Sequence, residues 1–131
     1  MNTIKLTAAI EQIVMQWEDT GKGANAIGGI AFLVHQKEFG HIHKNGDLDI
    51  VYGKEITSRL LENKLVKMHQ YVPNEAISYP VSGENSISFA VTLLRFSYLL
   101  HLKETKQSNN RFDGALDSEL HKLRKDLCLD K

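Results

Sequence analysis

Residues 38–50 decide the fold that we expect, and they read Glu-Phe-Gly-His-Ile-His-Lys-Asn-Gly-Asp-Leu-Asp-Ile. Apolar and polar side chains alternate on both sides of residues 44–47, whose Asn-Gly pair is favoured in tight type I′ hairpin turns. The pattern predicts two antiparallel strands, at about 39–43 and 48–52. Residues 29–35 are apolar and partly β-branched, so they predict a preceding strand and hence a three-stranded meander.

The alternation also assigns side chains to the two faces of this meander. Successive residues of a strand point to opposite faces, so His41 and His43 share a face with Phe39, and Ile42 points the other way. On the next strand Asp49 lies opposite to its apolar neighbours. If the face of Ile42 covers the core, then His41, His43 and Asp49 face solvent or a ligand.

The rest of the chain alternates between helical and extended patterns. Apolar residues at helical spacing predict helices, and short apolar runs beside turn residues predict two more strands. The expected helices are 3–18, 54–64, 86–103 and 115–129, and the expected strands are 65–72 and 76–81. The fold class is therefore α+β, an antiparallel meander sheet of about five strands packed on helices, with a long buried helix near 86–103.

The C-terminal part differs from the rest in composition. We expect a single α+β domain at 1–103, a polar linker at 104–114 and an amphipathic helix at 115–131. Leucines recur on a narrow stripe of that helix: Leu116, Leu120, Leu123 and Leu127. Two interpretations are open, because the stripe either packs back on its own domain or forms a homo-oligomer.

Composition limits the partners and the compartment. The 131 residues include 16 basic and 16 acidic side chains, so the net charge is zero and no overall field attracts nucleic acid or an anionic membrane. The single cysteine, Cys128, cannot form an internal disulfide. No charged-then-apolar leader and no apolar run of about 18 residues is present in the sequence. We therefore expect a cytoplasmic protein that binds neither nucleic acid nor membrane.

Histidines and a carboxylate form the one constellation that could carry chemistry. His41 and His43 stand on one strand face, Asp49 on the next strand, and His69 follows the short helix. One hypothesis is a divalent metal held by His41, His43 and His69, with Asp49 as fourth ligand or as the acceptor that fixes a tautomer. Zinc, iron or manganese would suit such ligands.

The same residues allow three other interpretations. His41 or His43, oriented by Asp49, could act as general acid or base, although no nucleophile accompanies them. The histidines and Arg95 could instead donate to a carboxylate or phosphate ligand. Finally, the histidines could bond one another and the strand ends and so only fix the fold. Arg95 stands on an apolar helix, and we expect it to pair with a carboxylate such as Asp49 or Glu38.

The order of these motifs resembles a known family. The Glu-x-Gly-His-x-His hairpin at 38–43, Asp49, His69 after a short helix, and Leu-Leu-Arg-Phe-Ser-Tyr at 93–98 are similar to the luciferase domain. The resemblance covers about residues 5–103. It departs at 75–77, where Glu-Ala-Ile replaces the Ser-Gly-Trp of many members, so a flat aromatic wall is missing from any pocket.

The resemblance implies a small bacterial domain but no particular reaction, and we do not predict light emission. The interpretation that we favour is a binding or interaction module with a small-ligand face that contains His41, His43, Asp49, His69 and Arg95. The alternative is a small metal-dependent or histidine-based enzyme acting on a small molecule. Bound metal or a histidine-like pH dependence of activity would favour the enzyme.

Overall fold

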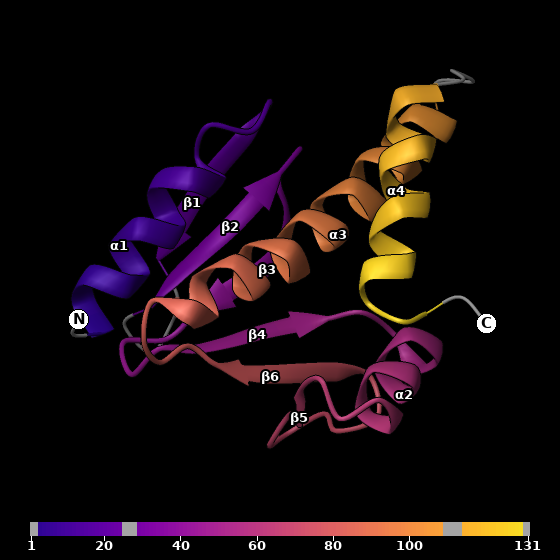
Figure 1. Ribbon diagram of the computed structural model, residues 1–131. Coiled ribbons are helices and arrows are strands. Elements are labelled where there is room, and N and C mark those ends of the chain that lie inside the picture. Colours follow the sequence, from indigo (N-terminus) through magenta and orange to yellow (C-terminus); the bar gives the residue numbers. More distant parts are fainter. Residues whose placement is uncertain (1–2, 25–28, 109–113, 130–131) are drawn as a thin grey trace.

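The computed structural model describes residues 3–24, 29–108 and 114–129, and it has an α+β fold (Figure 1). Six strands form one antiparallel sheet in the order β1-β2-β3-β4-β6-β5. The strands are β1 (Thr20–Ala24), β2 (Ile30–Val34), β3 (Lys37–Ile42), β4 (Asp47–Val51), β5 (Lys67–Met68) and β6 (Ala76–Pro80). The helices are α1 (Thr3–Val14), α2 (Lys54–Glu62), α3 (Asn85–Ser108) and α4 (Gly114–Asp126). The predicted fold class and the central meander are confirmed.

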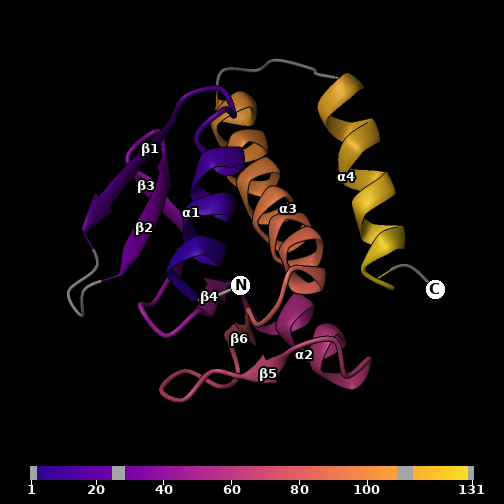
Figure 2. The same cartoon turned by 60° about the vertical axis from the view of Figure 1, so that its left-hand side comes forward.

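Helices α1 and α3 cover one face of the sheet, and they run side by side in both views (Figures 1 and 2). The core lies between these helices and the sheet, where Ile42, Leu48 and Ile50 are almost fully buried. Ile42 therefore points to the helices, and the face that carries His41 and His43 is turned away from them. No helix among the described residues is long and apolar enough to cross a bilayer.

Strand β1 was not expected from the sequence. Its residues, Thr-Gly-Lys-Gly-Ala, lack apolar alternation, so the pattern indicated only a glycine-rich link. In the structure all five pair with β2, from Thr20 opposite Val34 to Ala24 opposite Ile30. Backbone pairing at a sheet edge does not require apolar side chains, which explains why a composition-based prediction misses this strand.

A β-bulge at Phe39 changes the expected face of that residue. Phe32 pairs with Gly40 and Leu33 pairs with Glu38, so Phe39 has no partner on β2. Its ring turns into the core, where only 1% of the residue is exposed. The prediction that Phe39 shares a face with His41 was wrong, because the extra residue interrupts the alternation.

The loop between β3 and β4 is a turn of a different type from the one expected. The Gly46 N–H donates to the His43 carbonyl at 2.9 Å, and Gly46 has a positive φ of 95°. Asn45 is not among the positive-φ residues, whereas a type I′ turn needs positive φ at both central positions. The loop is therefore a turn closed by a left-handed glycine, and it still gives the predicted antiparallel hairpin.

The long helix extends beyond the expected end. Helix α3 continues to Ser108, so residues 104–108 of the predicted linker are helical, and 109–113 lie outside the described residues. The buried Ser97 hydroxyl donates to the Phe39 carbonyl at 2.6 Å, which ties the helix to the bulge of β3.

Helix α4 packs back on its own chain. Its leucine stripe lies against α3, with Leu116, Leu120 and Leu123 each at least nine-tenths buried. After the helix, the Arg59 guanidinium of α2 donates to the Leu129 carbonyl at 3.0 Å. The stripe is covered within the chain, so it is not an exposed surface for homo-oligomer formation.

Arg95 joins α3 to α4. Its guanidinium donates to both carboxylate oxygens of Glu119, at 2.6 and 2.8 Å. The same group lies 5.1 Å from the ring centroids of Trp17 and Tyr98, within the range of cation–π attraction. A two-pronged pair with a fixed fork geometry is the kind of surface ion pair that contributes measurably to stability.

We expect Glu119→Gln to lower the free energy of unfolding by about 1 kcal/mol at neutral pH. The hydrogen bond from Arg95 holds the pKa of Glu119 below its usual value of 4.5. The contribution is therefore present above that usual value and is lost as pH falls through the lowered value. Urea unfolding at pH 7 and in acid measures this, with the exposed Glu62→Gln as control. A loss that persists unchanged in acid would contradict the assignment to the ion pair.

Candidate metal and ligand site

The sheet aligns the site residues in a row across four strands. His41 of β3 pairs with Asp49 of β4, Asp49 pairs with Ser78 of β6, and Ser78 pairs with Lys67 of β5. Paired residues point to the same face, so the row lies on the side of the sheet that α1 and α3 do not cover. His43 is two residues beyond His41 and shares its face. The pairing of these four strands thus assembles the site, and the sequence predicts this pairing only in part.

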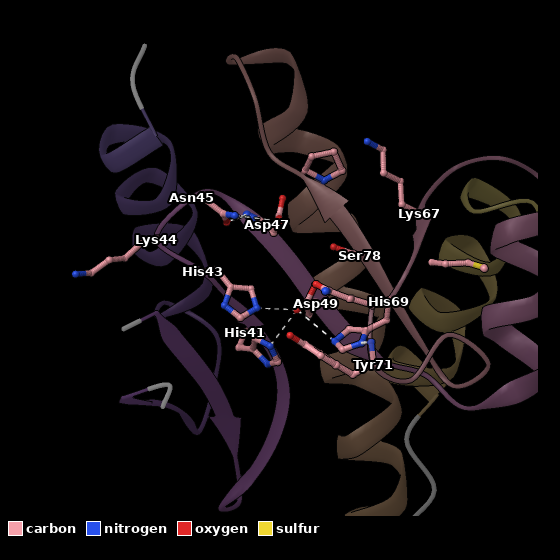
Figure 3. A pocket seen from close by; sticks show the side chains of 13 residues that line it. His41, His43, Lys44, Asn45, Asp47, Asp49, Lys67, His69, Tyr71 and Ser78 are labelled. Carbon is pink, nitrogen blue, oxygen red and sulfur yellow. Dashed lines mark hydrogen bonds and ion pairs between the residues drawn. The ribbon is translucent and has the colours of Figure 1, made fainter. Parts of the chain in front are cut away.

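Three imidazole rings converge on one oxygen of Asp49 (Figure 3). The distances from its Oδ2 are 2.7 Å to His43 Nε2, 3.3 Å to His41 Nε2 and 3.4 Å to His69 Nε2. The Asp49 side chain is 10% exposed, and each histidine side chain is between 14% and 18% exposed. We call these four residues the histidine cluster. They are four of the five ligand-binding residues that the sequence suggests.

Asp49 is held in its ionised form. Burial alone would raise the pKa of Asp49, but hydrogen bonds from His41, His43 and Ser78 outweigh burial and lower the pKa to about 2. The Ser78 hydroxyl therefore donates to the carboxylate and is not activated by a histidine. This arrangement lacks the serine–histidine hydrogen bond of a nucleophilic pair.

His41 lies between two carboxylates. Its Nε2 faces Asp49, and its Nδ1 lies 2.8 Å from Oε2 of Glu38. The hydrogen bonds to Asp49 and then to Glu38 raise the pKa of His41 to about 9, although burial opposes them. Glu38 was not expected at the site, because strict alternation would turn it away from His41. The bulge at Phe39 brings the two side chains to one face.

The tautomer of His69 is fixed by the backbone. Its Nδ1 accepts hydrogen bonds from the N–H groups of Tyr71 at 3.1 Å and Val72 at 3.2 Å. An accepting Nδ1 requires that the neutral ring carry its hydrogen on Nε2, the atom that faces Asp49. A protonated nitrogen cannot bind a metal ion. This tautomer favours Asp49 over His69 as the third candidate ligand, and the ligand set of His41, His43 and His69 stays a prediction.

Arg95 does not reach the histidine cluster. It stands on α3, at the covered face of the sheet, and its guanidinium is bound to Glu119. The expected pairing with a carboxylate is present, but the partner is neither Asp49 nor Glu38. The sequence could not indicate Glu119, because the packing of α4 on α3 brings the two together from 24 positions apart.

A pocket of about 870 Å³ opens over the cluster and is lined by its four residues. This volume lies in the range of small-molecule sites. Apolar lining comes from Met68, Tyr71 and Pro80, and Lys44 and Lys67 add positive charge (Figure 3). Among the described residues, no carboxylate lies within ion-pair distance of either lysine.

Three of the pocket's candidate ligand atoms are grouped closely enough for one metal ion. Nitrogens of His41 and His43 and an oxygen of Asp49 all lie within 4.8 Å of one another. They come from adjacent strands, and the pocket lies open beside them. The arrangement provides two imidazoles and one carboxylate on one side of a cavity.

Comparison with known proteins gives one family. The family model described as the Luciferase domain matches residues 36–97, which is somewhat less than half of the chain. This segment contains Glu38 and the whole histidine cluster, and it is shorter than the range of 5–103 expected from the sequence. No curated protein and no solved structure matches the chain. Over residues 36–97, the chain resembles the luciferase-domain family.

Proposed function

We propose that this protein is a binding module that holds a divalent transition-metal ion, and with it a small ligand, in the pocket over β3 and β4. The protein ligands are His41 Nε2, His43 Nε2 and one carboxylate oxygen of Asp49. The observation that carries the proposal is the grouping of these three residues, whose candidate ligand atoms all lie within 4.8 Å of one another beside an open pocket.

A charge-assisted hydrogen bond between nitrogen and a carboxylate oxygen measures about 2.7–2.9 Å, and only the contact between His43 and Asp49 meets this. Ligand atoms about 2.0–2.1 Å from a tetrahedral metal lie about 3.3 Å from one another. The 3.3 Å separation of His41 Nε2 from Asp49 Oδ2 agrees with that value.

Glu38 supports the same assignment. In metal sites, a histidine ligand usually donates its other ring N–H to a carboxylate, which fixes the tautomer and makes the ring a better ligand. Glu38 lies in that position, 2.8 Å from Nδ1 of His41. A metal ion would displace the proton from His41 Nε2. The neutral ring, with its hydrogen on Nδ1, would then bind Glu38 on one side and the metal on the other.

The ligand set narrows the choice of metal. Imidazole suits zinc and iron, and a carboxylate also suits manganese, whereas soft copper(I) sites use sulfur ligands. Three protein ligands leave at least one coordination position open, as in zinc sites that bind water or substrate. The open position would face the pocket, which agrees with a site for a further ligand.

Metal content measured by elemental mass spectrometry on untagged protein tests the proposal. The protein is incubated with zinc, iron(II) or manganese and then freed of excess metal by gel filtration. We expect close to one equivalent of metal per chain for at least one of the three ions. Folded protein that retains none of them would show that the cluster is only a hydrogen-bonded part of the fold.

The role of His69 gives a second, independent prediction. We expect His69→Asn to retain the metal, because the asparagine Oδ1 can replace Nδ1 as acceptor for the Tyr71 and Val72 N–H groups. Metal content of this variant, measured beside the wild type, checks the assignment. If a folded His69→Asn variant loses the metal, the three ligands are His41, His43 and His69, as the sequence predicts.

We also propose that the module works in the cytoplasm. Its one cysteine, Cys128, is exposed and free, and a reducing compartment would keep it so.

A further inference from the structure

We infer that the ligand completing this site is a small organic anion, a carboxylate with an apolar body, whose oxygen binds the metal and accepts a hydrogen bond from His69. This inference rests on the proposed metal site and deepens it.

The acceptors at the centre of the pocket are already engaged. Asp49 is bound by the cluster and by Ser78, and Asp47 receives a hydrogen bond from the Asn45 amide at 3.2 Å. The Asn45 carbonyl oxygen in turn accepts from the Asp47 backbone N–H at 3.0 Å. The Asp49 carboxylate at the centre of the cluster therefore offers an incoming ligand little acceptor capacity.

The His69 donor, in contrast, makes no strong hydrogen bond within the pocket. His69 directs its Nε2–H at Asp49 across 3.4 Å, which is too long for a strong charge-assisted hydrogen bond. Once a metal occupies the Asp49 oxygen, this donor is free to bond an oxygen held at the open coordination position. His69 cannot accept instead, because its only lone pair is committed to Tyr71 and Val72.

Charge around the pocket favours an anion as well. A divalent metal, Lys44 and Lys67 together carry more positive charge than Asp47 and Asp49 carry negative charge. The two lysines extend at the rim on either side of the cluster (Figure 3). Neither is within ion-pair distance of a carboxylate of the described residues, so both can attract a ligand by long-range electrostatics.

Exposed apolar side chains at the same rim indicate that the anion has an apolar body. Met68 is 60% exposed and Tyr71 is 78% exposed, and both line the pocket. The Tyr71 ring meets the His69 ring edge-on, with 6.1 Å between the centroids. A flat apolar group bound above His69 would cover the Tyr71 ring and gain its burial.

The test uses protein loaded with Co²⁺, whose visible spectrum reports on its coordination shell, and benzoate as the probe. Metal content is measured first. We expect benzoate to change the spectrum saturably and the neutral isostere benzamide to leave it unchanged. His69→Asn should weaken benzoate binding at least about tenfold, the cost of losing one hydrogen bond to a charged group. The matched control is His35→Asn, which changes a histidine outside the pocket at a positive φ that asparagine tolerates.

Each outcome decides between the two proposals. Protein that holds Co²⁺ but does not respond to benzoate, or responds equally to benzamide, overturns the anion inference and leaves the metal site standing. Equal benzoate binding by His69→Asn and His35→Asn overturns the role of the His69 donor. Wild-type protein that retains no metal overturns the proposed function, and the inference fails with it.

Discussion

Replacing His43 by asparagine is expected to weaken zinc binding by more than about 100-fold, because loss of a partner that merely orients a ligand already costs about 10–100-fold. His43 makes the shortest contact of the cluster, 2.7 Å from Nε2 to Asp49 Oδ2. The asparagine side chain is too short to place a ligand atom where Nε2 stands. The remaining two ligands, His41 and Asp49, would leave most of the coordination shell to water.

Competition with a chelator of known zinc affinity measures the change in zinc affinity of His43→Asn. The control is His35→Asn, since His35 stands in the turn between β2 and β3 and does not line the pocket. Thermal melting of the metal-free proteins separates lost binding from lost folding, because His43 lies on the sheet face that is turned away from the core. Equal zinc affinity in the two variants would remove His43 from the ligand set.

The sequence predicted the members of the cluster better than their roles. His41, His43 and Asp49 follow from the alternation of side chains on two strands joined by a short loop, and local pairing keeps such a register. His69 was placed correctly near them, but its tautomer depends on two backbone N–H groups of its own loop. That contact is a detail of loop geometry, which residue pattern alone does not specify.

Glu38 and Arg95 illustrate what periodicity cannot predict. Glu38 reaches His41 only because a bulge adds one residue to β3, and nothing in the alternation marks a bulge. Arg95 was expected to pair with a carboxylate, and the choice of Glu119 depends on how α4 docks against α3. Both outcomes depend on tertiary packing, in which a residue's neighbours come from distant parts of the chain.

The fold class followed from strong local signals, whereas the edges of the fold did not. Long apolar helices and alternating strands bury their apolar faces in only a few ways, so an α+β sheet covered by α1 and α3 was predictable. Strand β1 carries no such signal, because its glycines and lysine pair through the backbone alone. Edge strands of this kind become evident only once the neighbouring strand is in place.

The last prediction concerns the bulge itself. Phe39→Ala is expected to lower the free energy of unfolding by about 3–5 kcal/mol, the range for phenylalanine removed from a packed core. Phe39 is 1% exposed, and its ring lies 5.5 Å from Tyr98 and 6.1 Å from Phe32 between centroids. The bulge turns the Phe39 ring into the core, and burial of this ring is the main apolar contribution of the bulged segment to stability. Phe39→Ala removes that contribution. A loss of this size is a large fraction of the total stability of about 5–15 kcal/mol expected for such a domain.

Urea unfolding of Phe39→Ala, followed by circular dichroism, measures this loss against Val51→Ala, a control at a site that is 62% exposed. The control is expected to cost less than about 0.5 kcal/mol. If Phe39→Ala does not fold, Phe39→Leu refills part of the cavity and should give an intermediate loss. A loss for Phe39→Ala no larger than that of the control would mean that the ring does not hold the bulge. The bulge, which brings Glu38 and His41 to one face of the sheet, would then need another cause.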